Sequence, residues 1–231
     1  MITIQRLSDF DNPVIQKKAE ELTSGKQSQL EKLQSIFYFV RDEIKFGFPP
    51  KWDEMKASEV IGCGLGYCNT KATLYHALCQ AVQIPSRIHF ASIDLQIMYG
   101  IFPSIIFPLL PKAGGHSWVE VNSDGKWYSI DSYINDKNFY KKALEKLKAS
   151  DRNIGYSISF IDGKSSCEFN FGDKGFVHMG AVVEDHNTWE DASDYFASDK
   201  YLKLEGFRKK FFLAITKIAN RNIEGIRTNL S

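Results

Sequence analysis

The sequence has little net charge and no long uninterrupted hydrophobic run, and both absences narrow the classes of protein to which it can belong. Its 231 residues carry 29 Lys and Arg against 28 Asp and Glu, which gives a formal net charge of +1. A nearly neutral chain offers no electrostatic reason to expect nucleic acid or an anionic membrane as a partner. The most apolar stretch, from Ile97 to Pro111, is short for a bilayer span and is broken by Pro103 and Pro108.

The sequence also lacks a recognisable secretion signal and a familiar cysteine pattern. Its first residues, MITIQRLSDF, do not combine a basic start with a long apolar run, so we expect a cytoplasmic protein. The four cysteines, Cys63, Cys68, Cys79 and Cys167, include no C-x-x-C pair and are followed by no H-x3-5-H motif. This spacing disfavours a disulfide framework, a structural zinc site and a metal-binding structural protein.

What is present is the composition of an ordinary globular protein, with 43% hydrophobic and 25% charged residues in a length that fits one domain. Apolar residues at helical spacing, with capping signals, predict helices at residues 12–24, 27–45, 57–61, 68–83, 137–148, 189–197 and 200–221. Strand-like composition predicts strands at residues 86–95, 116–121, 127–131, 156–161, 167–171 and 176–183. Helices first, followed by strands clustered in mid-chain, indicate an α+β domain with an antiparallel sheet.

Cys68 stands where a glycine-rich turn becomes a helix, in the stretch GLGYCNTKATLYHALCQAVQIPSRI from Gly64 to Ile88. The free backbone N–H groups and the dipole of a first helical turn stabilise negative charge, so this position predicts a thiol with a lowered pKa. Nearby glycines let the backbone turn tightly, and the N–H of Cys68 is placed to donate to an oxyanion. A cysteine at a helix start is also commonly a small buried apolar residue, so both roles stay open on this motif alone.

A nucleophilic cysteine needs a base, and the base needs an orienting partner. His116 opens the predicted strand HSWVEV, and Asp131 closes the next one, WYSID, across the turn NSDGK. A four-residue turn pairs 116 with 131, whereas a two-residue Asp124-Gly125 turn pairs 118 with 131 and makes His116 and Asp131 diagonal neighbours. A three-residue turn places them on opposite faces unless a bulge intervenes. Two of these three registers therefore predict a His–Asp pair.

These motifs resemble those of the transglutaminase-like superfamily of papain-like cysteine enzymes. In that family a G-x-C turn opens a helix that ends in a G-I-P-x-R-like phrase, the base lies in an H-x-W-x-E-like strand, and the acid closes a W-x-x-x-D-like strand. The phrases GLGYCNTKATLYHALCQAVQIPSRI, GGHSWVEV and WYSIDSY follow this order, and IFYFVRDEIKFGF is similar to the family's preceding helix. The resemblance covers about residues 30–135, with Gln83 where a glycine is usual and Ser132 where a proline is common.

The resemblance implies Cys68 as the nucleophile, His116 as the base and Asp131 as the residue that orients the histidine. It implies an α+β fold in which a papain-like core, about residues 27–135, packs the cysteine-bearing helix on an antiparallel sheet. N-terminal helices and a C-terminal α/β extension complete a single domain, 1–231. Trp52 is a candidate second oxyanion donor, with packing as its commoner role. We expect the substrate cleft to include Gly66, Tyr67, Gly115 and Trp118.

The predicted reaction is acyl transfer or hydrolysis at an amide or thioester carbonyl, on a peptide, protein or small-molecule acyl substrate. It requires no metal and no organic cofactor. The segment from Ile97 to Pro111 is either an apolar lid or wall over the cleft or an ordinary buried loop, and His178 and His186 are candidates to line the cleft. The alternative is a catalytically inactive scaffold that acts as a binding or interaction module. The acceptor, with a slight preference for water over an amine, and the oligomeric state stay open.

Overall fold

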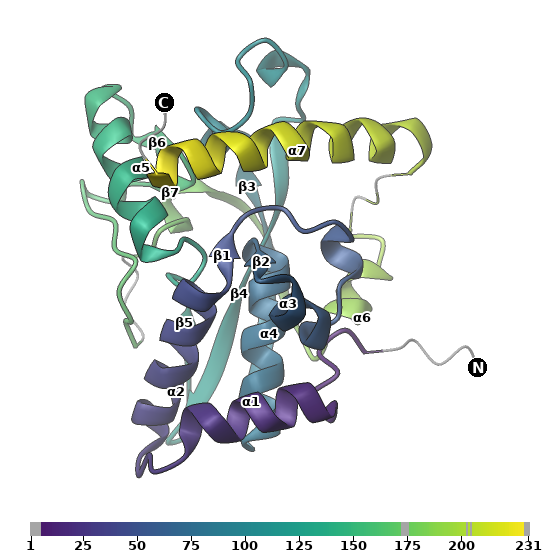
Figure 1. Ribbon diagram of the computed structural model, residues 1–231, viewed down its shortest axis with the longest axis vertical. Coiled ribbons are helices and arrows are strands. Elements are labelled where there is room, and N and C mark those ends of the chain that lie inside the picture. The colour runs from purple at the N-terminus through teal and green to yellow at the C-terminus, as the bar shows by residue number, and fades with distance from the viewer. Residues whose placement is uncertain (1–5, 172–175, 202, 204, 229–231) are drawn as a thin grey trace.

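A four-stranded antiparallel sheet with the Cys68 helix packed on it forms the centre of the computed structural model (Figure 1). The structure describes residues 6–171, 176–201, 203 and 205–228. The sheet has the order β5-β4-β3-β8, with strands β3 (Ser86–Asp94), β4 (Ala113–Ser123), β5 (Lys126–Ile130) and β8 (Val182–Trp189). The predicted α+β fold with an antiparallel sheet is therefore confirmed.

The Cys68 helix, α4 (Cys68–Ala81), is enclosed on several sides, which explains why nearly all of its residues are buried. It packs against β3 and β4 on one side and against three N-terminal helices on the other. These helices are α1 (Pro13–Thr23), α2 (Gln29–Tyr38) and α3 (Ala57–Cys63). The predicted helix at 27–45 is shorter than expected, because α2 passes at Tyr38 into a π-helical turn, Phe39–Glu43. A short parallel pair, β1 (Lys45–Phe46) and β2 (Leu65–Gly66), leads into α4.

The end of α4 accounts for one departure from the family pattern. Gln83 follows the helix with a φ of +59°, in the left-handed region that glycine adopts most easily. A glycine is usual at this position because the chain must turn there toward Ile84 and β3. In this chain glutamine adopts the same conformation, so the difference in sequence does not change the path of the backbone.

The hairpin of β4 and β5 adopts one of the three registers that the sequence leaves open. Asp124 and Gly125 form the two-residue turn with φ values of +51° and +78°, and Val119 lies opposite Ile130. Positive φ at both turn residues is the geometry that matches the twist of a hairpin. In this register Asp131 follows the last paired residue of β5 and is a diagonal neighbour of His116.

The C-terminal region differs most from the sequence prediction. The predicted strand at 156–161 is reduced to β7 (Ile158–Ser159), paired with β6 (Ile154–Gly155), because Tyr156 and Ser157 have φ values of +52° and +59° and turn the chain. The prediction of a strand at 167–171 is wrong, since that segment has no strand pairing, and the strand predicted at 176–183 begins only at Val182. The helices here are α5 (Lys137–Ala149), α6 (Ala192–Phe196) and α7 (Gly206–Thr228).

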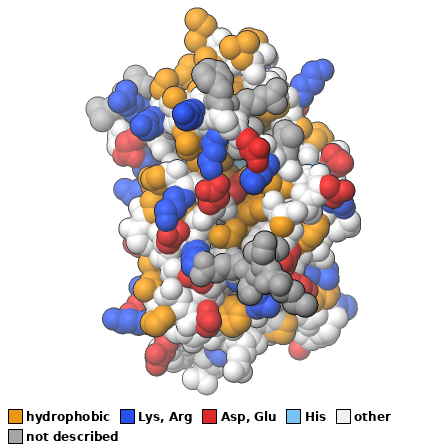
Figure 2. Space-filling view, turned by 90° about the vertical axis from the view of Figure 1, so that its right-hand side faces the viewer, with side chains coloured by type: hydrophobic (Ala, Val, Ile, Leu, Met, Phe, Trp, Pro, Cys, Tyr) orange, Lys and Arg blue, Asp and Glu red, His pale blue; other side chains and the backbone are white. Residues whose placement is uncertain are grey.

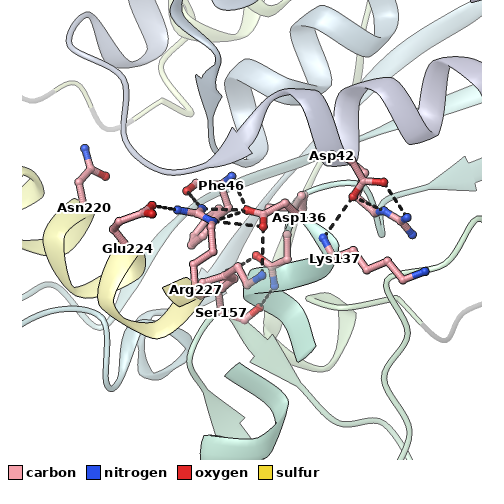
Figure 3. Close-up of polar contacts among 12 residues, drawn as sticks. Asp42, Phe46, Asp136, Lys137, Ser157, Asn220, Glu224 and Arg227 are labelled. Carbon is pink, nitrogen blue, oxygen red and sulfur yellow. Dashed lines mark hydrogen bonds and ion pairs between the residues drawn. The ribbon is translucent and has the colours of Figure 1, made fainter. Parts of the chain in front are cut away.

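Helix α7 crosses the end of the molecule above β1 and β2 (Figure 1) and is held there by polar contacts. Figure 3 shows Arg227 meeting Asp136, the N-cap of α5, and the carbonyl of Phe46, to which it donates at 2.8 Å each. Earlier in the same helix, the Asn220 side-chain amide contacts the backbone of Phe48. Its oxygen accepts from the Phe48 N–H, and its nitrogen donates to the Phe48 carbonyl. These contacts fix α7 against β1 and the segment that connects it to β2 and α4.

The surface is of mixed charge where Figure 2 views it. Lys, Arg, Asp and Glu side chains alternate over this face, with hydrophobic side chains at the end where the loop after β3 projects. Ile105 and Leu109 of that loop are 85% and 73% exposed. In the described part of the chain, no helix combines the length and the hydrophobicity needed to cross a membrane.

Candidate active site

A cavity of about 300 Å³ lies beside Cys68, and most of its lining is apolar. Cys68 is the first residue of α4, after an N-cap residue, Tyr67, in extended conformation, so the thiol lies at the helix end that faces the cavity. The walls come from parts of the chain that are far apart in sequence: Phe48, Leu95, Met98, Phe102 and Phe212. The site is thus assembled by the tertiary fold around the first turn of one central helix.

The Cys68 thiol is held close to two oxygen atoms. Its Sγ lies 3.7 Å from the carbonyl oxygen of Gly115 and 3.6 Å from Oδ1 of Asn69, both of which accept a hydrogen bond from a protonated thiol. Burial raises the pKa of Cys68, and the negative charges of Asp53 and Asp131 add to the shift. The expectation of a lowered pKa is therefore wrong, because burial outweighs the N-terminal position in the helix.

His116 and Asp131 meet on the sheet next to the cysteine. His116 Nε2 lies 3.5 Å from Asp131 Oδ2, and both side chains are fully buried. Within the described residues, neither side chain has a hydrogen bond of normal geometry to any other group. Gly115, whose carbonyl contacts the thiol, directly precedes His116, so β4 places His116 next in sequence to a residue that touches Cys68.

A second carboxylate, Asp53, organises the other side of Cys68 and was not singled out by the sequence. It accepts hydrogen bonds from the hydroxyl groups of Tyr67 and Tyr201 and, at 2.9 Å, from the side-chain amide of Asn69. Asn69 in turn accepts from the Ser117 hydroxyl at 3.0 Å. Burial raises the pKa of Asp53 against the effect of these bonds. The network fixes Asn69, the residue that follows the cysteine. The one sequence feature that could have pointed to this network is an asparagine within a helix whose other residues are mostly buried.

Trp52, the candidate second oxyanion donor, lines the cavity. Its backbone has a φ of +53°, a strained value for a bulky residue, and its ring lies 5.6 Å from that of Phe48 in a stacked arrangement. The indole Nε1 is buried and has no hydrogen-bond partner in the described structure. A buried donor without a partner, beside a cavity, is available to a ligand.

Two of the four predicted cleft residues line this cavity and two lie behind it. Tyr67 and Gly115 are part of the lining. Gly66 is a buried residue of the β1–β2 pair, and a Cβ added to it would lie 2.8 Å from Cγ of Lys71. Trp118 is packed on His89, with ring centroids 4.1 Å apart.

The C-terminal extension supplies part of the cavity wall. His178 and His186 both line the cavity, as considered from the sequence, together with Ser157 and Tyr201. Ile97, Met98, Phe102 and Pro111 add side chains from the Pro-interrupted segment, which therefore forms part of a wall. The ring of His178 lies 5.1 Å from that of His116.

Lys71 lies one turn beyond Cys68 on α4 and is fully buried. Its Nζ donates to the carbonyls of Arg41, Tyr133 and Ile134 at 2.8–3.2 Å. Burial lowers its pKa to about 7. Lys71 therefore ties α4 to the chain that follows Asp131.

The described residues contain no group of three or more His, Cys, Asp or Glu side chains arranged to hold a metal ion. All four cysteines are free thiols.

A cysteine at the start of a central helix, packed on a sheet that carries a buried histidine and aspartate, defines a cysteine-type hydrolase or acyltransferase scaffold. A family model described as the transglutaminase-like superfamily matches residues 16–132, just over half of the chain. The protein therefore belongs to the transglutaminase-like superfamily, as its motifs predict.

The solved structures that are similar include the following two. One, described as a "putative cysteine protease" from Cytophaga hutchinsonii, is 16% identical with a TM-score of 0.48, over 82% of this chain and 46% of its own. The other, described as a "putative protease" from Parabacteroides distasonis, is 17% identical with a TM-score of 0.36, over 53% of this chain and 25% of its own. The chain thus spans less than half the length of either structure. No curated protein matches it.

Proposed function

We propose that the protein is an enzyme that transfers or hydrolyses an acyl group from an amide or thioester carbonyl, with Cys68, His116 and Asp131 as its catalytic residues. The observation that carries this proposal is the buried contact of 3.5 Å between His116 and Asp131. His116 directly follows Gly115, whose carbonyl touches the Cys68 thiol. A nucleophile, a base and an orienting acid are the minimum set for this chemistry.

Because burial raises the pKa of Cys68, the resting thiol is neutral, and its proton leaves during the attack. His116 Nε2 faces Asp131, so Nδ1 takes that proton as Sγ bonds to the carbonyl carbon. The carbonyl electron pair moves onto oxygen, where the N–H of Cys68 and the free indole N–H of Trp52 donate to it. When the carbonyl re-forms, the leaving amine or thiol takes the proton from His116. Water, or an amine, then attacks the acyl-enzyme by the same path in reverse.

The cavity supports a hydrophobic acyl group as the part of the substrate that is bound. Phe48, Met98, Phe102 and Phe212 face the space beside the thiol, and apolar walls favour apolar groups through the area that they remove from water. We take water as the acceptor, since no amine site is evident beside Cys68 among the residues that the structure describes.

The second candidate function is a binding module without turnover. The observation in its favour is the burial of Cys68, which is 6% exposed and has a raised pKa. On that reading the cavity binds an apolar ligand, and the thiol remains unreactive.

Site-mapped alkylation with iodoacetamide between pH 5 and 9.5, on the folded protein and a His116→Ala variant, separates the two. Cys63, half-buried outside the cavity, is the reference thiol, and Cys79, fully buried among apolar residues, reports unfolding. Because His116 is proposed to take the thiol proton, we expect Cys68 to react at least tenfold more slowly in the variant, whereas Cys63 should react at the same rate in both proteins. If Cys68 reacts only together with Cys79, or is indifferent to His116, the enzyme is rejected in favour of the binding module.

A further inference from the structure

His178 is placed to contact the substrate, although it lies outside residues 16–132 that match the family. Its imidazole is 4% exposed, lies 5.1 Å from the ring of His116, and lines the cavity together with Cys68 and Gly115. The mechanism proposed above gives this second histidine no task.

A closed set of hydrogen bonds fixes the tautomer of His178. Its Nε2 lies 2.9 Å from the carbonyl oxygen of Ser157 and 2.8 Å from the hydroxyl of the same residue. The carbonyl also accepts from the side-chain amide of Asn135 at 2.6 Å, while the Ser157 hydroxyl donates to the Asn135 carbonyl oxygen at 3.0 Å. A carbonyl accepts only, so Nε2 carries the hydrogen, and Nδ1 carries a lone pair.

That lone pair has no partner among the described residues. Burial and the neighbouring His116 lower the pKa of His178 to about 4, so the ring is neutral near pH 7 and Nδ1 remains an acceptor. A buried acceptor without a donor is unfavourable in a folded protein, unless a bound molecule completes it. A hydrogen-bond donor on a molecule bound in the cavity would supply the missing partner.

The backbone around Ser157 is strained in order to hold this arrangement. Tyr156 and Ser157 are consecutive residues with φ values of +52° and +59°. Their N–H groups donate to the carbonyls of Tyr99 and Ile97 at 2.7 and 2.8 Å, which pins the turn to the segment that forms the cavity wall. Strain that the surrounding structure maintains at a ligand site is typical of preorganised binding groups.

We propose that His178 is a specificity-determining residue whose Nδ1 accepts a hydrogen bond from the N–H of the substrate's scissile amide. The inference rests on the proposed function of the Cys68 site, and it narrows the substrate class to amides that carry an N–H. Esters and thioesters have no hydrogen at this atom and leave Nδ1 unsatisfied. During reaction His116 delivers the second proton to the nitrogen, and the hydrogen held by His178 stays on it, so His178 neither gains nor loses a proton.

The test measures binding, so that it does not depend on turnover. Every protein carries Cys68→Ala, and the probes are N-methyl-3-phenylpropanamide and its isosteric ester, methyl 3-phenylpropanoate, titrated by ligand-observed NMR. Comparing the amide-to-ester affinity ratio between variants cancels the difference in hydration of the two probes. We expect His178→Leu to lower that ratio about fivefold to tenfold, as the loss of one neutral hydrogen bond implies.

Two further variants make the result specific. In His178→Asn the amide oxygen takes the place of Nδ1 and cannot titrate near neutral pH, so the ratio stays near that of the parent. His76, a buried histidine on α4 whose Nδ1 bonds to the Ser86 hydroxyl, provides the matched control, and His76→Leu leaves the ratio unchanged. In the parent, adding the amide shifts the 15N resonance of His178 Nδ1, and adding the ester does not.

An equal ratio in the His178→Leu and parent proteins overturns the inference, and so does an absence of amide binding by the parent. Neither result depends on a reactive thiol. If Cys68 alkylation does not respond to the His116→Ala substitution, the proposed function is rejected instead. The preference of His178 for an amide over an ester is still tested by the binding measurements.

Discussion

The contact between Arg227 and Asp136 fastens α7 over the cavity region, and its removal has a calculable cost. The two side chains are 7% and 6% exposed, and the guanidinium donates to the carboxylate at 2.8 Å (Figure 3). Removing one partner of a buried ion pair costs about 3–5 kcal/mol. In Arg227→Met the carboxylate keeps the N–H groups of Phe46 and Phe139, each at 3.0 Å, so we expect the lower end, about 3 kcal/mol, or about a hundredfold in the folding equilibrium.

Urea unfolding at pH 7, followed by circular dichroism, measures this cost. Lys217→Met, at an exposed position of the same helix, is the control and should change the free energy of unfolding by less than about 0.5 kcal/mol. Asp136→Asn and the double variant complete a cycle, in which the two single losses should be strongly non-additive. Losses below about 1 kcal/mol that add independently would refute the reasoning, because they would mean that the pair is solvated and α7 is not fastened by it.

The same pair gives a pH dependence with a defined sign. Burial opposes ionisation of Asp136, but the hydrogen bonds and positive charge of Arg227 prevail and lower its pKa. A carboxyl whose folded pKa is lowered stabilises the protein above its unfolded pKa of about 3.9, and this contribution is lost as the pH falls through the folded value. Stability should therefore decline below about pH 4 in the parent, and less steeply in Asp136→Asn.

Of three further predictions, two concern the site and one concerns the packing of the segment that forms part of its wall. Asp131→Asn should slow acylation of Cys68 by a thioester probe about a hundredfold, measured by intact-protein mass spectrometry, because the His116 tautomer is no longer fixed; a loss below about threefold would contradict an orienting role. Gly100→Ala should lower stability in thermal unfolding by more than Gly163→Ala, since both have positive φ but only at Gly100 would the Cβ meet Tyr156, at 2.1 Å; equal losses would refute the packing argument. Phe212→Ala should shift the preferred acyl group of probe thioesters to a larger one, because this ring lines the cavity, whereas the exposed Phe211→Ala should not.

The parts of the fold that local sequence determines could be predicted. Helix α4 followed from apolar spacing after Cys68, and the β4–β5 hairpin followed from Asp124-Gly125 between two strand-like segments. Two of the three possible hairpin registers make His116 and Asp131 neighbours, because the pairing of the strands determines which residues lie close together. These are the features in which a few residues decide the geometry without help from the rest of the chain.

The remaining features depend on contacts between distant segments. The raised pKa of Cys68 results from burial beneath several segments, which the first turn of a helix does not reveal. Segment 167–171 has the composition of a strand, yet it has no partner strand in the described structure, since pairing and not composition makes a strand. Asp53 is placed against Asn69 and Tyr201 by tertiary packing, so nothing in its own sequence neighbourhood marked it.

The division of roles along the chain follows from where the cavity lies. The segment that matches the family carries all three proposed catalytic residues, whereas Ser157, His178 and Phe212 come from the chain beyond residue 132. Asp191 of this later segment accepts from the backbone N–H groups of Leu7 and Ser8, so the extension is also fastened to the N-terminal segment. We infer that the described residues form one domain, in which the family core carries the proposed catalytic residues and the core and the extension together form the cavity. Exchange of the extension between relatives should then alter substrate preference in part, while the requirement for Cys68 is kept.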